Sequence, residues 1–88
     1  MSIIIDREKY TALMTLIQTS QGYVGSKVQP NGYTLKCSFD TGFACCISRN
    51  TRNSNLSVHF ENESTDPATH FAILSAINYA NISDRYVF

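Results

Sequence analysis

The first quarter of the chain has the hydrophobic spacing of an amphipathic helix. Four apolar residues recur at intervals of three and four positions and would share one helical stripe: Tyr10, Leu13, Met14 and Ile17. Asp6 can accept hydrogen bonds from the free N–H groups of a first turn, and Gly22 offers a left-handed residue at which a helix ends. The spacing therefore predicts a helix over residues 6–20.

The middle of the chain changes to a period of two. Apolar and polar residues alternate over 33–39, 43–48 and 56–61, which predicts three strands that each have one apolar face. A further strand over 23–29, with Val24 and Val28 facing the core, would be a fourth.

Two turn sequences punctuate these strands, Pro30-Asn31-Gly32 and Asp40-Thr41-Gly42. If the second turn closes on a Phe39–Phe43 pair, Lys36 lies opposite Cys46 and Cys37 lies opposite Cys45. The turn thus fixes which side chains of two neighbouring strands meet.

A second helix is predicted to begin at Pro67, because Asp66 is a good cap and proline suits the first helical position. Ile73, Leu74 and Ile77 would line its inner face, Asn81 would end it, and residues 82–88 would form an apolar tail involved in contacts. We therefore expect one domain over residues 1–88 with an α+β fold: a helix, a three- or four-stranded antiparallel meander and a helix, with both helices packed on one face of the sheet.

The charge balance and the cysteine number limit which classes of protein this chain can belong to. The 88 residues include 7 basic and 7 acidic side chains, so the formal net charge is zero. This balance lacks the electrostatic footprint of a nucleic-acid or membrane binder. The N-terminal residues have neither the basic flank nor the apolar run of a targeting signal. An odd number of cysteines, three, is typical of reduced thiols. We expect a cytoplasmic protein, in the host cytoplasm if it is phage-encoded.

The cysteines and histidines show no metal-ligand spacing, and Cys45 and Cys46 would point to opposite faces of a strand. No metal site and no cofactor are expected, and Cys37 and Cys45 are interpreted as packing residues. Cys46 and His59 share the outer face of the sheet, and one strand register would place them side by side. This pair raises the alternative of a thiol enzyme centred on Cys46. The pattern offers no pocket and no third residue to orient the imidazole, so we expect a protein that is not an enzyme.

A second alternative is a weak nucleic-acid-binding domain. Arg49 and Arg52 flank a hairpin loop and, with Lys36, could contact phosphates. The order helix, three strands, helix is shared with double-stranded RNA-binding domains, which have a basic cluster at the start of the second helix. Residues 64–70 contain no Lys or Arg. Few positive charges predict little counterion release and hence modest affinity.

A protein partner is the favoured hypothesis. The outer sheet face would be small and nearly neutral, and the tail adds aromatic side chains. In size and composition, though in no motif, the chain resembles small phage or mobile-element inhibitors of host machinery, anti-CRISPR proteins among them. That resemblance implies a non-catalytic binding protein that inhibits or modulates a larger protein or complex by occlusion. Edge strands and an apolar tail are also compatible with a homodimer. The candidate partner-binding residues are Arg49, Arg52, Tyr86, Phe88, Lys36 and His59.

Overall fold

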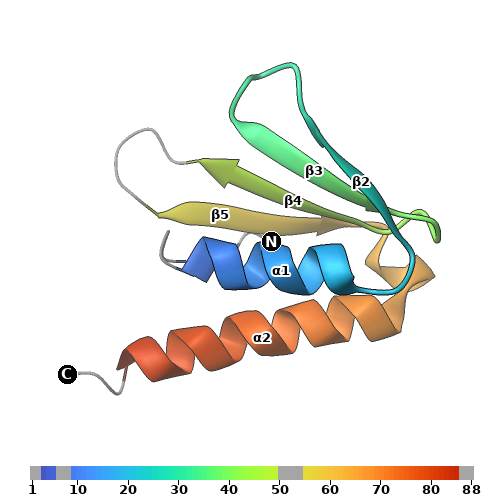
Figure 1. Cartoon of the computed structure of the whole chain (residues 1–88). Coiled ribbons are helices and arrows are strands. Elements are labelled where there is room, and N and C mark those ends of the chain that lie inside the picture. Colours follow the sequence, from blue (N-terminus) through green and yellow to red (C-terminus); the bar gives the residue numbers. More distant parts are fainter. Residues whose placement is uncertain (1–2, 6–8, 50–54, 86–88) are drawn as a thin grey trace.

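The computed structural model describes residues 3–5, 9–49 and 55–85, which form one antiparallel sheet with two helices on the same face (Figure 1). The elements follow in the order β1 (Ile3–Ile5), α1 (Tyr10–Thr19), β2 (Tyr23–Val28), β3 (Thr34–Phe39), β4 (Ala44–Arg49), β5 (Leu56–Glu61), the short 3-10 helix η2 (Glu63–Thr65) and α2 (Pro67–Arg85). The strand order in the sheet is β1-β5-β4-β3-β2. The predicted α+β arrangement of helix, four-stranded meander and helix is confirmed.

The hairpin of β3 and β4 has the predicted register. Phe39 N–H donates to the carbonyl of Phe43 at 3.0 Å, and Gly42, with a φ of 90°, completes the turn. Lys36 therefore pairs with Cys46, and Cys37 pairs with Cys45. The turn chemistry alone sets these cross-strand neighbours.

The strand β1 was not predicted. Ile5 pairs with Leu56 of β5 and is 2% exposed, so it belongs to the sheet and the core. The helix α1 begins at Tyr10, later than the predicted start at residue 6. Asp6, the predicted cap, lies outside the described residues.

Val24 and Val28 are not buried in the core as predicted, because they are 65% and 58% exposed. The register of β2 against β3 shifts between Tyr23 and Gly25, so Val24 is an extra residue in a bulge. Val28 lies opposite Leu35 at the end of β2, where it lines a solvent-open groove. Its position in the alternation of β2 was predicted correctly, but its side chain is not buried.

The helix α2 begins as predicted. Asp66 accepts a hydrogen bond from Thr69 N–H at 3.2 Å, which caps the first turn. Ile73 and Ile77 are 0% and 3% exposed and face the core. The helix continues to Arg85, past the end predicted at Asn81.

The core lies between the helices and the inner face of the sheet. Its largest fully buried side chain, Phe43, has ring contacts with Phe39, Phe60 and His70. The His70 ring of α2 packs edge-on against Phe60 of β5 at 4.6 Å, which holds the start of α2 on the sheet. Cys37 and Cys45 are free thiols with no exposed surface, as expected of packing residues.

Candidate functional site

Three of the six predicted partner-binding residues belong to the described part of the chain: Lys36, Arg49 and His59. The other three lie outside the described residues and stay predictions. They are Arg52, Tyr86 and Phe88.

The described residues do not form one surface. Lys36 and His59 flank Cys46 on the outer face of the sheet, which carries no helix (Figure 1). Arg49 has the parity of the buried Ile47 and so belongs to the opposite, helix-bearing face. Arg49 and Lys36 are therefore separated by the sheet itself.

Arg49 lines a solvent-open groove of about 340 Å³ at the hairpin end of the sheet, which we call the Arg49 groove. Its backbone N–H donates to the carbonyl of Tyr33 at 2.9 Å, which joins the two sides of the groove. Tyr33 is 47% exposed and forms part of the lining instead of the core. The apolar lining comes from α1 and four strands: Tyr10, Val28, Tyr33, Leu35, Ile47 and Leu56.

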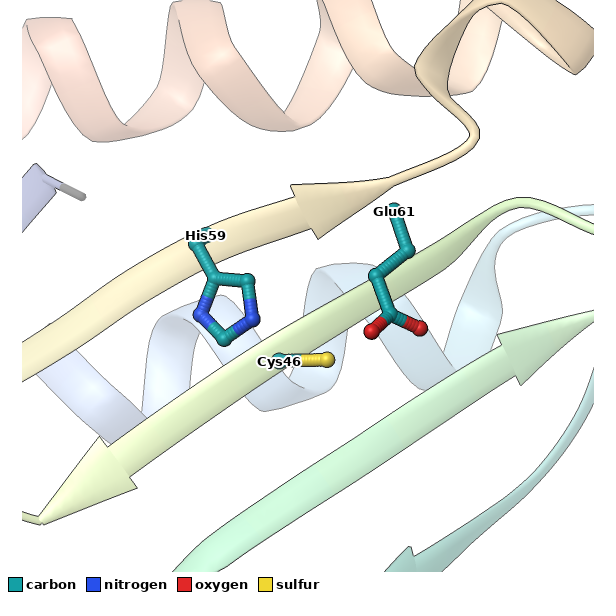
Figure 2. A group of neighbouring side chains, drawn as sticks. All are labelled: Cys46, His59 and Glu61. Carbon is teal, nitrogen blue, oxygen red and sulfur yellow. The ribbon is translucent and has the colours of Figure 1, made fainter. Parts of the chain in front are cut away.

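The outer face carries a cluster of chemically active side chains, Cys46, His59 and Glu61, which we call the outer-face cluster (Figure 2). Cys46 lies directly opposite His59 in the pairing of β4 with β5, and Glu61 follows two residues later on the same face. One ligand atom from each side chain lies within 4.8 Å of the other two. Glu61 thus lies near His59, but its ion pair is with Lys36, and whether a third residue orients the imidazole stays a prediction.

Glu61 was not singled out from the sequence, although its spacing of two from His59 indicates a shared face. The spacing of Cys and His along the chain does not indicate this cluster, because the cluster forms across two strands. Its assembly depends on the register of β4 against β5.

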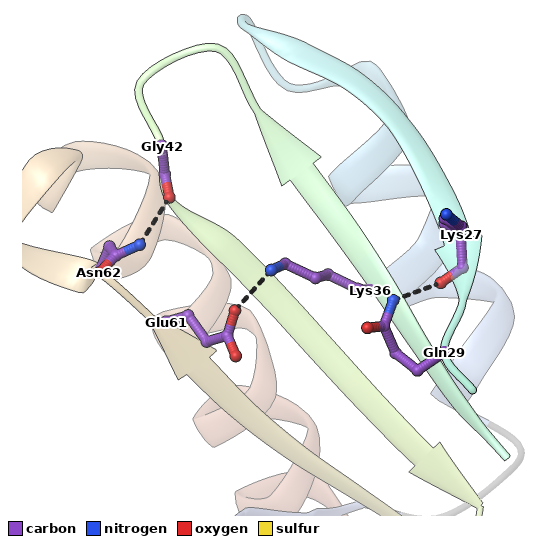
Figure 3. A network of polar contacts seen from close by, with 6 residues as sticks. All are labelled: Lys27, Gln29, Lys36, Gly42, Glu61 and Asn62. Atoms are coloured by element: carbon purple, nitrogen blue, oxygen red, sulfur yellow. Dashed lines mark hydrogen bonds and ion pairs between the residues drawn. The ribbon is translucent and has the colours of Figure 1, made fainter. Parts of the chain in front are cut away.

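Lys36 adds a positive charge to the outer-face cluster. Its Nζ lies 2.9 Å from Oε1 of Glu61 (Figure 3). The hydrogen bond and the attraction between the two charges raise the pKa of Lys36. The same hydrogen bond lowers the pKa of Glu61. Both side chains are about 40% exposed, so water screens the pair and its contribution to stability is small.

The Cys46 thiol is protonated at neutral pH. Burial raises its pKa most, the charge of Glu61 raises it further, and Lys36 opposes these effects only in part. A thiol needs its thiolate form to act as a nucleophile. Neither the Arg49 groove nor the groove between α1 and α2 is lined by the outer-face cluster. The three side chains have the composition of a catalytic triad but line neither groove.

Side-chain hydrogen bonds link neighbouring segments at both ends of the outer face. Thr34 and Ser48 share a hydroxyl hydrogen bond of 2.9 Å across β3 and β4. At the other end, Asn62 donates from Nδ2 to the carbonyl of Gly42 at 3.1 Å (Figure 3). The strands that position the cluster are thus tied together by side chains as well as by backbone.

Comparison with known proteins gives no match to a protein-family model, to a curated protein or to a solved structure. Over the residues that the structure describes, no helix has the length and hydropathy needed to cross a membrane. Fold and surface together define a small α+β domain with an apolar groove beside Arg49 and a polar cluster on its helix-free face.

Proposed function

We propose that this protein is a non-catalytic binding protein that docks on a larger protein or complex and inhibits or modulates it by occlusion. The observation that carries the proposal is the Arg49 groove, which combines apolar walls with a guanidinium group at its end. Arginine and tyrosine are the side chains that most often dominate the binding energy of protein interfaces. Both are present here, in Arg49 and Tyr33.

The groove suits a protein partner of defined chemistry. An aliphatic or aromatic side chain of the partner would enter between Tyr33 and Leu35, while a carboxylate of the partner would pair with Arg49. The chain has no net charge, so affinity would depend on this anchor more than on long-range attraction. The size and composition shared with small phage-encoded inhibitors favour a partner in host machinery.

The nucleic-acid alternative is less well supported by the arrangement of charges. Its phosphate contacts would come from the loop that carries Arg49 and Arg52, with Lys36 as a third cation, yet the strand pairing places Lys36 on the opposite face of the sheet from Arg49. The thiol-enzyme alternative is disfavoured by the raised pKa of Cys46 and by the position of Cys46 outside both grooves.

The test is capture of a partner followed by reconstitution. The tagged protein would recover interacting proteins from a lysate of the cell in which it acts, and the recovered partner would be purified and titrated by calorimetry. Tyr33→Ala and Arg49→Ala are expected to weaken binding by about 30-fold each, the effect of losing a central interface residue. The backbone bond between these residues survives both substitutions, so the strands stay paired.

The matched control is Gln18→Ala, which removes an exposed polar side chain on α1. This variant should bind as tightly as the wild type. Equal binding by the groove variants and the wild type would refute the proposed site. A folded protein that captures nothing, as a monomer or as a homodimer, would refute the proposed function.

A further inference from the structure

We propose that Cys46, His59 and Glu61 form a binding site for Zn²⁺ on the helix-free face of the sheet. This inference goes beyond the proposed docking function and rests on a different part of the surface. Three ligand atoms from adjacent strands already lie within 4.8 Å of one another (Figure 2). The site would be built by the sheet, without a dedicated loop.

The donor set selects the class of metal. A thiolate, an imidazole and a carboxylate are all established Zn²⁺ ligands, and a soft sulfur ligand disfavours Mg²⁺ and Ca²⁺. Three protein ligands leave one tetrahedral position open. The described elements place no helix over this face, so water can fill that position (Figure 1).

The geometry needs only side-chain movement. Bonds of about 2.0–2.3 Å around a tetrahedral ion place ligand atoms about 3.3–3.7 Å apart. Reducing a separation of 4.8 Å to that range needs shifts of about 1 Å, within the reach of χ rotations of Glu61 and His59. Both side chains are half-buried, and Glu61 would have to leave its ion pair with Lys36, whereas Cys46 is 3% exposed and lies within β4. The sulfur would serve as the rigid ligand, and the other two would close on it.

In the metal-free protein, the positive charge beside Glu61 comes from Lys36. Its ammonium group lies 2.9 Å from Glu61 Oε1, where a bound cation would compete with it (Figure 3). On binding, Zn²⁺ would be coordinated by the Glu61 carboxylate and by the Cys46 sulfur, whose proton would pass to solvent. Lys36 would then lose its partner and turn outward. Removal of Lys36 should therefore strengthen metal binding.

The test uses the full chain, stripped of metal with a chelator and kept reduced with a phosphine that does not bind zinc. Zn²⁺ is titrated by calorimetry, and Co²⁺ serves as the spectroscopic probe, because a sulfur-to-cobalt charge-transfer band reports coordination by a thiolate. We expect one equivalent to bind, with about 10-fold or greater loss of affinity in Cys46→Ser, His59→Gln and Glu61→Gln. Lys36→Met should bind about 2–5-fold more tightly, as expected for loss of an exposed competing charge.

Each ligand has a control of the same residue type elsewhere in the chain. Cys37→Ala, His70→Gln and Glu63→Gln should keep wild-type affinity and the cobalt–sulfur band. Circular dichroism establishes that each variant is folded, and Glu61→Gln, at a half-exposed position, remains informative if Cys46→Ser does not fold. The proposal is overturned if folded wild-type protein binds no Zn²⁺ at a tenfold excess. It is equally overturned if binding survives Glu61→Gln unchanged or is weakened as much by the controls.

Discussion

The position of α2 on the sheet gives the sharpest test of the fold. Ile73 has no exposed surface and belongs to the core cluster that includes Phe43 and Val58. Replacing Ile73 by Ala removes three carbon atoms at the contact between helix and sheet. The neighbouring His70 and Ile77 are buried or partly buried too, so the backbone there has little freedom to collapse into the space.

The expected loss of stability is large for a chain of this size. Truncation of a fully buried Ile to Ala costs about 2–5 kcal/mol. An 88-residue domain has a total stability of about 4–13 kcal/mol. For such a domain each kcal/mol lowers the melting temperature by about 4–8 °C, so Ile73→Ala should lower it by about 8–40 °C.

Thermal unfolding followed by circular dichroism measures this shift, with urea unfolding as the second probe. Ile73→Val is the graded control and should cost about 0.5–1.5 kcal/mol. Ser75→Ala, two residues along on the exposed side of α2, should stay within about 0.5 kcal/mol of the wild type. A melting temperature for Ile73→Ala within about 2 °C of the wild type would show that α2 does not pack on this sheet as described.

Three further predictions test local structure. Gly22→Ala and Gly42→Ala both place a side chain at a φ near 90° and should each cost about 1–3 kcal/mol. Gly22→Ala should cost more, since its Cβ would meet Asp40 Oδ1 at 2.7 Å while that of Gly42 meets open space; equal urea midpoints would contradict this. Hydrogen bonds from Thr69 and Thr41 lower the pKa of Asp66, so the stability it contributes is present above about pH 4 and is lost as the pH falls through the folded-state pKa. The free energy of unfolding of Asp66→Asn should therefore fall less than that of the wild type as the pH is lowered, which urea titrations between pH 2 and about 6 would measure. The three free thiols are 3% exposed or less and should react with a disulfide reagent only after unfolding, whereas one thiol that reacts rapidly in the folded protein would restore the thiol-enzyme alternative.

The sequence predicted the features that depend on turn and capping residues close by in the chain. The Asp40–Gly42 turn determined the register of β3 and β4, because a short turn leaves one way to pair the flanking residues. The Asp66-Pro67 start of α2 followed from capping chemistry. These features depend on residues within a few positions of one another, and the sequence pattern is sufficient for them.

The features that the pattern missed depend on distant contacts. A strand as short as Ile3–Ile5 has too few residues for a period, and its pairing with β5 joins parts of the chain more than fifty residues apart. The bulge at Val24 changes which residues face the core without any change in the alternation of residue types. Glu61 joins Cys46 only through the register of β4 with β5, and the connection between these strands is too long to determine it.

The two surface features are independent because β4 alternates. Cys46 and Arg49 are three positions apart, an odd number, so one contributes to the outer-face cluster and the other to the Arg49 groove on the opposite face. A substitution at either residue leaves the other's strand neighbours in place. Arg49→Ala should therefore weaken partner binding while Zn²⁺ titrates as in the wild type, and Cys46→Ser should have the reverse effect. If both activities were lost together in folded variants, the sheet would not separate the two sites, and the assignment of faces on which both proposals rest would be wrong.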